Sequence, residues 1–171
     1  MANHNLGTNI GLTNQTSIKE YFSYLENSYL CFMISRYDAS LKKQIYYAKK
    51  AYYIDQAISY LLGFHNSSDY GRILENIVFI ELLRRNKEIY FHKGKQECDF
   101  VIREGIKITQ AIQVTKVLNS NRERKIKGLL EAMKQYKLKE GLILTKDQEE
   151  SFIVEKKKVF VIPLWKWLLT K

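Results

Sequence analysis

A short segment, residues 97–102 (ECDFVI), places two carboxylates where they could act together. Its alternation predicts a β-strand whose apolar side chains face the core, so that Glu97 and Asp99 project together from the other face. The next predicted strand, residues 107–116, carries Gln113 on the face opposite its apolar residues. Carboxylate and amide oxygens are hard ligands of the kind that Mg²⁺ or Mn²⁺ prefers, so the two strands form a candidate metal site.

Glu75 completes the predicted site from a helix that precedes both strands. Apolar residues follow it three, four and seven positions later, so its carboxylate lies beside an apolar stripe. Burying an unpaired charge is costly, and a metal ion would offset that cost. We therefore expect Glu75, Asp99 and Gln113 to be metal ligands. The bound Mg²⁺ or Mn²⁺ would activate a water molecule and stabilise negative charge on a phosphodiester.

The predicted site depends on how the two strands pair. A three-residue loop over residues 104–106 would keep Asp99 and Gln113 on one face of the sheet. A two-residue loop over residues 104–105 would place Asp99 opposite Gln110 and separate the two side chains. Taken singly, each of these polar residues also has an ordinary structural explanation, as a capping residue, a solvated carboxylate or a satisfied amide.

The order of these groups resembles the PD-(D/E)XK nuclease superfamily, in which a helix Glu, a strand Asp and a motif on the next strand form the site. More closely, the chain is similar to the domain of uncharacterised function that follows the ATPase module in a large family of archaeal and bacterial AAA-type ATPases. The resemblance runs from about Ser17 to the C-terminus. The segments that carry it are 71–76 (GRILEN), 97–101 (ECDFV), 112–114 (IQV), 141–145 (GLILT) and 162–169 (IPLWKWLL).

The chain departs from the superfamily pattern at the third motif, which is Glu-x-Lys in the superfamily and Gln-Val-Thr at residues 113–115 here. Gln113 offers an oxygen without charge. Thr115 cannot replace the lysine that positions the attacking water or stabilises developing negative charge. Lys116 follows directly but points to the opposite face unless a bulge redirects it. The resemblance therefore implies a weakened catalytic set, consisting of Glu75, Asp99, Gln113, Thr115 and Lys116.

A run of basic residues opens the predicted helix after the site. Arg124 or Lys125 could reach back to the site in place of the missing lysine, and the run could contact phosphates. The same run also suits a solvated helix face. The candidate nucleic-acid-binding residues are Lys116, Arg122, Arg124 and Lys125.

Periodicity predicts an α/β fold with a mixed sheet flanked by helices, and the resemblance implies that it is restriction-endonuclease-like. A small winged-helix-like segment, with one helix and a hairpin, precedes it. We predict two domains, residues 1–64 and 65–171, with the boundary at a turn-forming cluster over residues 63–69. The predicted helices cover residues 71–85 and 122–136, a short segment at 165–169 closes the chain, and the predicted strands cover residues 29–34, 51–54, 89–92, 97–103, 107–116, 141–145 and 159–162.

Composition narrows the function classes. The 171 residues carry a net charge of +10, and residues 71–171 hold 22 Lys and Arg against 13 Asp and Glu, which gives +9 of that charge. Such a basic half attracts polyanions, nucleic acid above all, although it could also serve solubility. No apolar run is long enough to span a bilayer, the first residues lack a signal-peptide pattern, and the two cysteines give no disulfide framework. We expect a cytoplasmic protein without membrane contact.

Three functions remain compatible with the sequence. The first is a nuclease-fold domain that binds nucleic acid, with weak or no cleavage, as the C-terminal part of an AAA-type ATPase. The phosphate-binding motif of such an ATPase is absent here, so this chain would not bind ATP, and the module would lie in the full-length protein or act in trans. The second is an active Mg²⁺- or Mn²⁺-dependent endonuclease. The third is a protein-interaction or oligomerisation module that does not bind nucleic acid.

Overall fold

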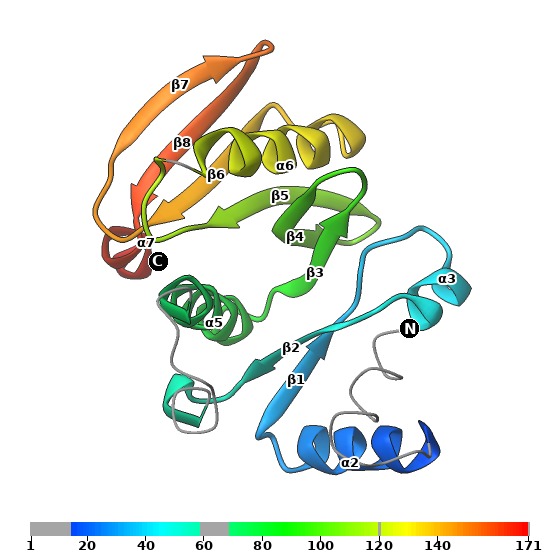
Figure 1. Ribbon diagram of the computed structural model, residues 1–171. Helices are drawn as coiled ribbons and strands as arrows, with labels where there is room; N and C mark the ends of the chain where they lie inside the picture. The colour runs from blue at the N-terminus through cyan, green and yellow to red at the C-terminus, as the bar shows by residue number, and fades with distance from the viewer. Residues whose placement is uncertain (1–14, 59–68, 120, 171) are drawn as a thin grey trace. The chain divides into compact units, whose positions relative to one another are not determined.

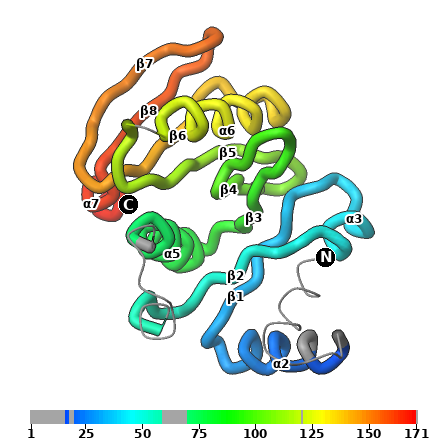
Figure 2. Tube along the Cα trace, viewed as in Figure 1, coloured from blue at the N-terminus to red at the C-terminus, as the bar shows by residue number. Residues whose placement is uncertain are grey.

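The computed structural model describes residues 15–58, 69–119 and 121–170, and Figures 1 and 2 trace the chain in one orientation. The chain divides into two compact units, residues 1–62 and residues 63–171. Residues 63–68 of the predicted boundary cluster lie outside the described residues.

The first unit contains a helix followed by a two-stranded antiparallel sheet, as its sequence predicts. Helix α2 (Gln15–Asn27) leads into strand β1 (Cys31–Ile34), and β1 pairs with β2 (Lys50–Tyr53) so that Cys31 faces Tyr53. A short helix, α3 (Leu41–Tyr46), interrupts the connection that we expected to be a plain turn.

The second unit is built on a six-stranded mixed sheet with the order β3-β4-β5-β6-β8-β7. The first three strands form an antiparallel meander, β6 is parallel to both β5 and β8, and β7 closes the sheet antiparallel to β8. The predicted mixed sheet flanked by helices is therefore confirmed. The strands are β3 (Glu88–Lys93), β4 (Glu97–Glu104), β5 (Lys107–Val114), β6 (Glu140–Thr145), β7 (Glu150–Val154) and β8 (Lys157–Pro163).

Helices α5 (Asp69–Arg84) and α6 (Arg122–Gln135) lie on opposite sides of this sheet (Figure 1). Both present apolar stripes at helical spacing, and burial of these stripes against the strands is the main driving force for this packing. The side chains that form the core under α5 and α6 are at most 6% exposed; they include Leu74, Val78, Phe79, Leu82, Leu129, Leu130 and Met133. Cys98 is also buried, as the sequence predicts.

Strand β7 is absent from the sequence prediction. Its side chains alternate only between exposed and half-buried, so its sequence lacks the apolar periodicity of a core strand. Glu155 and Lys156 form the tight turn that follows it, and both have positive φ angles, 51° and 62°. The lysine run at 156–158 therefore lies mostly in β8.

The chain ends in a short helix, α7 (Leu164–Leu169), and the half-buried Arg85 at the end of α5 contacts it. The Arg85 guanidinium lies 4.5 Å above the Trp167 ring and donates hydrogen bonds to two carbonyl oxygens of this segment. Glu81 accepts hydrogen bonds from Arg84 and Arg85 and is 8% exposed. Among the described residues, no helix has the length and apolar character needed to cross a membrane.

The register between β4 and β5 decides which side chains meet at the candidate site. The loop is a two-residue turn, Gly105-Ile106, with Gly105 at a φ of +61°. This turn alone would place Asp99 opposite Ile112. A bulge then adds one residue, Thr109, because Arg103 pairs with Ile108 while Ile102 pairs with Gln110. Beyond the bulge Phe100 pairs with Ile112, so that Asp99 and Gln113 share a face. The loop is therefore neither of the two considered above, and the bulge gives the register that brings the two side chains to one face.

Candidate functional site

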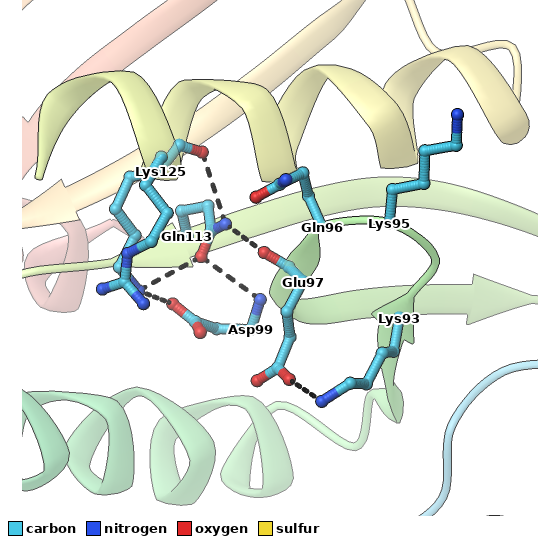
Figure 3. A pocket seen from close by; sticks show the side chains of 8 residues that line it. Lys93, Lys95, Gln96, Glu97, Asp99, Gln113 and Lys125 are labelled. Carbon is cyan, nitrogen blue, oxygen red and sulfur yellow. Dashed lines mark hydrogen bonds and ion pairs between the residues drawn. The ribbon is translucent and has the colours of Figure 1, made fainter.

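A polar pocket of about 270 Å³ lies between the β3–β4 hairpin, strand β5 and the first turns of α6 (Figure 3). Glu97 and Asp99 both line it, as the alternation of the strand predicts, and Gln113 joins them from β5. Four cationic side chains and two carboxylates meet here, which gives the lining a positive balance. The full lining consists of Lys93, Lys95, Gln96, Glu97, Asp99, Gln113, Arg124 and Lys125.

A buried ion pair forms the centre of the pocket. The Lys125 ammonium nitrogen lies 2.7 Å from Asp99 Oδ2, and the two side chains are 14% and 7% exposed. The same nitrogen lies 3.3 Å from Gln113 Oε1. Lys125 thus reaches back from the helix to the two strand residues that the sequence singled out. This buried ammonium compensates the Asp99 carboxylate in the interior of the unit.

Backbone N–H groups of the strands hold in place the two oxygen atoms that face Lys125, Asp99 Oδ2 and Gln113 Oε1. The Val114 backbone N–H donates to Asp99 Oδ2 at 2.8 Å, and the Asp99 backbone N–H donates to Gln113 Oε1 at 3.3 Å. These side-chain bonds begin where the backbone pairing of β4 with β5 ends, and there β5 begins to pair with β6. The strands thus separate at the site, and polar side chains bridge the gap between them.

The Gln113 amide group joins α6 to the sheet. Its nitrogen donates to the backbone oxygens of Glu97, at 2.7 Å, and of Lys125, at 3.3 Å. This close approach requires a glycine on the helix, because a Cβ at Gly128 would lie 2.1 Å from the Glu97 oxygen and 2.6 Å from the Gln113 nitrogen. Gly128 therefore allows α6 to lie close enough for Lys125 to reach Asp99.

A second polar contact fixes the hairpin loop that borders the pocket. Glu131 on α6 accepts a hydrogen bond from the Gln96 backbone N–H at 3.0 Å, and its other oxygen lies 3.2 Å from Nε2 of the buried His92. Burial alone would raise the pKa of Glu131, but the His92 contact and the backbone N–H groups of the loop outweigh it and lower that pKa. Glu131 therefore holds the loop against the helix as a carboxylate.

The four cationic side chains of the pocket differ in whether they form an ion pair. Lys93 pairs with Glu97 at 3.1 Å, and Lys125 pairs with Asp99. Lys95 and Arg124, by contrast, make no ion pair within the described residues, and both are exposed. Figure 3 shows Lys95 on the hairpin, extending alongside α6. Unpaired cations of this kind attract anions from solution.

The remaining predicted residues lie elsewhere. Glu75 is half-buried on α5 and is not part of the pocket lining. Thr115 follows the end of β5, where its hydroxyl donates to the Val117 oxygen and accepts from Asn121. Lys116 lies 4.8 Å above the Tyr70 ring, and Arg122 pairs with Glu150. Of the residues we proposed, the structure thus brings together Asp99, Gln113, Arg124 and Lys125.

The residues of the pocket do not fit a divalent metal ion. Asp99 Oδ2 and Gln113 Oε1, two oxygens that would bind one, already accept the Lys125 ammonium, and Gln113 brings no charge. Within residues 15–58, 69–119 and 121–170, no three His, Cys, Asp or Glu side chains gather as a metal-binding group. A metal ion at these oxygens would have to displace the ammonium.

Three residues that line the pocket, Lys93, Lys95 and Gln96, were not predicted from the sequence as site residues. Lys93, Lys95 and Gln96 surround a glycine between two strands, a pattern that indicates a hairpin loop without indicating what lies next to it. Lys125, by contrast, was among the predicted residues. Its sequence position carries a further signal, because it precedes the buried Leu129 by four positions and therefore shares its helix face. A lysine on a buried helix face needs a partner.

Comparisons with known proteins found two family models and relatives that match most of the chain. A model described as Domain of unknown function (DUF8612) matches residues 1–68. An uncharacterized protein of Methanocaldococcus jannaschii is 37% identical over 165 residues, which cover 90% of this chain and 36% of that protein. An uncharacterized protein of Haemophilus influenzae is 30% identical over 158 residues, covering 92% of this chain and 38% of that protein.

The chain therefore spans a little over a third of the length of these relatives. No solved structure matches it. The model described as Domain of unknown function (DUF4143) matches residues 70–167, which include the whole six-stranded sheet and the pocket. This match covers more than half of the chain, which therefore belongs to the DUF4143 family.

Proposed function

We propose that this chain is a nucleic-acid-binding part of an AAA-type ATPase, with a nuclease-like second unit that cleaves weakly or not at all. The observation that carries the proposal is the pocket, in which the Asp99 carboxylate is paired with Lys125 while Lys95 and Arg124 lack an ion-pair partner among the described residues. The carboxylate is neutralised, so it does not repel a phosphate, and the two rim cations attract one.

The positions of the rim cations favour an extended polyanion. Arg124 stands on α6 and Lys95 on the hairpin loop, so they come from two separate elements that border the pocket. A phosphodiester backbone presents one charge after another along its length and can contact both elements, whereas one small anion needs convergent donors. The positive balance of residues 71–171 adds attraction at longer range.

The proposal also includes a place in a larger protein. The relatives are nearly three times as long as the segment they share with this chain, which leaves room for the ATPase module that the sequence resemblance implies. In this arrangement the module would hydrolyse ATP, and the present chain would contact nucleic acid through its second unit. The ATPase would lie in the same polypeptide or act in trans.

Binding of labelled single-stranded and double-stranded oligonucleotides, measured by fluorescence anisotropy in EDTA over a range of salt concentrations, tests the proposal. We expect affinity to fall steeply with salt, and Arg124→Ala to weaken binding and to lower the salt slope by about one. Lys127→Ala is the matched control, because it removes one charge from the same helix at a side chain that pairs with Glu123 and does not line the pocket.

Three results would contradict the proposal in different ways. Equal losses in the Arg124 and Lys127 variants would mean that charge alone, and not the pocket, binds the oligonucleotide. Cleavage that requires Mg²⁺ or Mn²⁺ and disappears in Asp99→Asn would favour the active endonuclease. No oligonucleotide binding, together with a molecular size that changes with protein concentration, would favour the interaction module.

A further inference from the structure

The pocket contains its own cation, and we propose that the Lys125 ammonium permanently takes the place of a divalent metal ion at Asp99 and Gln113. The site would then contact a phosphate group directly, without metal. The contact with phosphate rests on the proposed function. The assignment of the Lys125 ammonium as the cation of the site, called the resident cation below, does not.

The geometry supports this assignment first through the two oxygens that face the ammonium. Asp99 Oδ2 and Gln113 Oε1 lie 2.7 and 3.3 Å from the Lys125 nitrogen. Each of these oxygens also accepts a backbone N–H, from Val114 and from Asp99 itself. Backbone bonds therefore fix both acceptors, and the ammonium fits between oxygens whose positions the sheet determines.

The charges supply the second argument. The Asp99 carboxylate faces the Lys125 ammonium, and the neutral Gln113 lies where the superfamily pattern has a second carboxylate. A single positive charge therefore neutralises the cluster of these three side chains. The other carboxylate of the pocket, Glu97, pairs with Lys93, so a divalent ion at the same oxygens would meet one negative charge and would approach the ammonium of Lys125 closely. Like charges at such a distance repel strongly in a mostly buried site, so the tethered lysine excludes the ion.

The number of ammonium protons supplies the third argument. A lysine ammonium has three N–H donors, and Asp99 and Gln113 accept two of those of Lys125. Lys125 lines the pocket, so the remaining N–H is available to a ligand there. A phosphate oxygen is the acceptor that the cations at the rim would bring to it.

Removal of the ammonium tests the inference. Lys125→Met leaves the Asp99 carboxylate without its counter-ion, and a metal ion could then enter. We would measure the thermal unfolding midpoint of wild type and variants with increasing Mn²⁺, together with calorimetric Mn²⁺ titrations. The wild type should not respond. Without Mn²⁺, Lys125→Met should unfold at a lower temperature than the wild type. Its unfolding midpoint should then rise by about 4 °C for each tenfold increase of the Mn²⁺ concentration above the dissociation constant.

Two further variants make the result decisive. In Asp99→Asn/Lys125→Met neither charge remains, so this protein should fold and ignore Mn²⁺. Lys125→Gln, which still offers a hydrogen bond to Asp99, carries the same test if Lys125→Met does not fold. A wild-type response to Mn²⁺ that is lost in Asp99→Asn would overturn the inference, because the ion would then displace the lysine. So would a lysine variant that folds but ignores Mn²⁺.

Oligonucleotide binding separates this inference from the proposed function. If wild type binds oligonucleotides equally well in EDTA and in Mn²⁺, both the proposed function and metal-free phosphate contact are supported. If no oligonucleotide binds but Mn²⁺ stabilises only Lys125→Met and Lys125→Gln, the proposed function is wrong. The assignment of Lys125 as the cation of the site is then still supported. Binding that requires Mn²⁺ in the wild type would overturn metal-free contact.

Discussion

The Lys125 ammonium nitrogen lies 2.7 Å from Asp99 Oδ2, although 26 residues separate the two in the chain. This pair joins the first turn of α6 to strand β4. In the inference proposed above, it also supplies the positive charge that a metal ion would otherwise bring. The stability of the unit and the chemistry of the pocket therefore depend on the same contact.

A double-mutant cycle on this pair should show strong coupling. Asp99→Asn or Lys125→Met alone should lower the free energy of unfolding by about 3–5 kcal/mol, because each leaves a buried charge without its partner. The double variant should lose less than the sum, with a coupling of about 2 kcal/mol or more, measured by urea denaturation. The exposed pair Glu123–Lys127 on the same helix is the control and should couple by about 0.5 kcal/mol at most. Additive losses at Asp99 and Lys125 would contradict the structure.

The close approach of α6 predicts opposite effects of two glycine substitutions. Gly128→Ala should destabilise the protein by about 1–3 kcal/mol and weaken oligonucleotide binding, since the new methyl group would collide with the Glu97 backbone and the Gln113 amide. Gly71→Ala on α5 is the control. Its methyl group would enter open space, so it should stabilise the protein by about 1 kcal/mol at most. Chemical denaturation of both variants would check this, and a neutral Gly128→Ala would refute the close contact.

The contact between Glu131 and the hairpin loop predicts a local change in dynamics. Glu131→Gln should speed hydrogen exchange at the Gln96 amide, which donates directly to this carboxylate. Because the pKa of Glu131 is lowered, the contact should be complete above the ordinary range of a glutamate and weaken as the pH falls below it. Glu123→Gln, an exposed change on the same helix, should leave this amide unaffected. Unchanged exchange in Glu131→Gln would show that other contacts hold the loop.

The carboxylate at the end of α5 predicts how stability depends on pH. The Arg84 hydrogen bond, against the opposing effect of burial and with the help of Arg85, lowers the pKa of Glu81 from 4.5 to about 2. Its stabilisation is therefore complete above pH 4.5 and is lost as the pH falls toward 2. Glu81→Gln should cost about 2 kcal/mol at neutral pH, and its difference from wild type should shrink across that window.

Urea denaturation at several pH values would check this profile. Glu104→Gln is a suitable control, because Glu104 also pairs with a cation, Lys87, but is far more exposed. Its removal should change the free energy of unfolding little at any pH. A difference between Glu81→Gln and wild type that stayed constant down to pH 2 would mean that Glu81 is not stabilised as a carboxylate.

Local patterns determined much of this protein. Alternation in β4 placed Glu97 and Asp99 on one face, and both line the pocket. Helical spacing identified α5 and α6, apart from a residue or two at their ends. These features follow from backbone periodicity and from the burial of apolar side chains, which act over a few residues and can be read in the sequence.

Tertiary structure decided how those pieces meet. The bulge at Thr109, and not the length of the turn, brings Gln113 to the face of Asp99. Lys125 reaches the pair only because Gly128 lets the helix approach the strand closely. Register and interelement distance result from the packing of the whole unit, so no local pattern specifies them. The sequence could therefore name the strand residues of the site and offer Arg124 or Lys125 as the cation that reaches them, whereas only the folded chain shows that Lys125 does so.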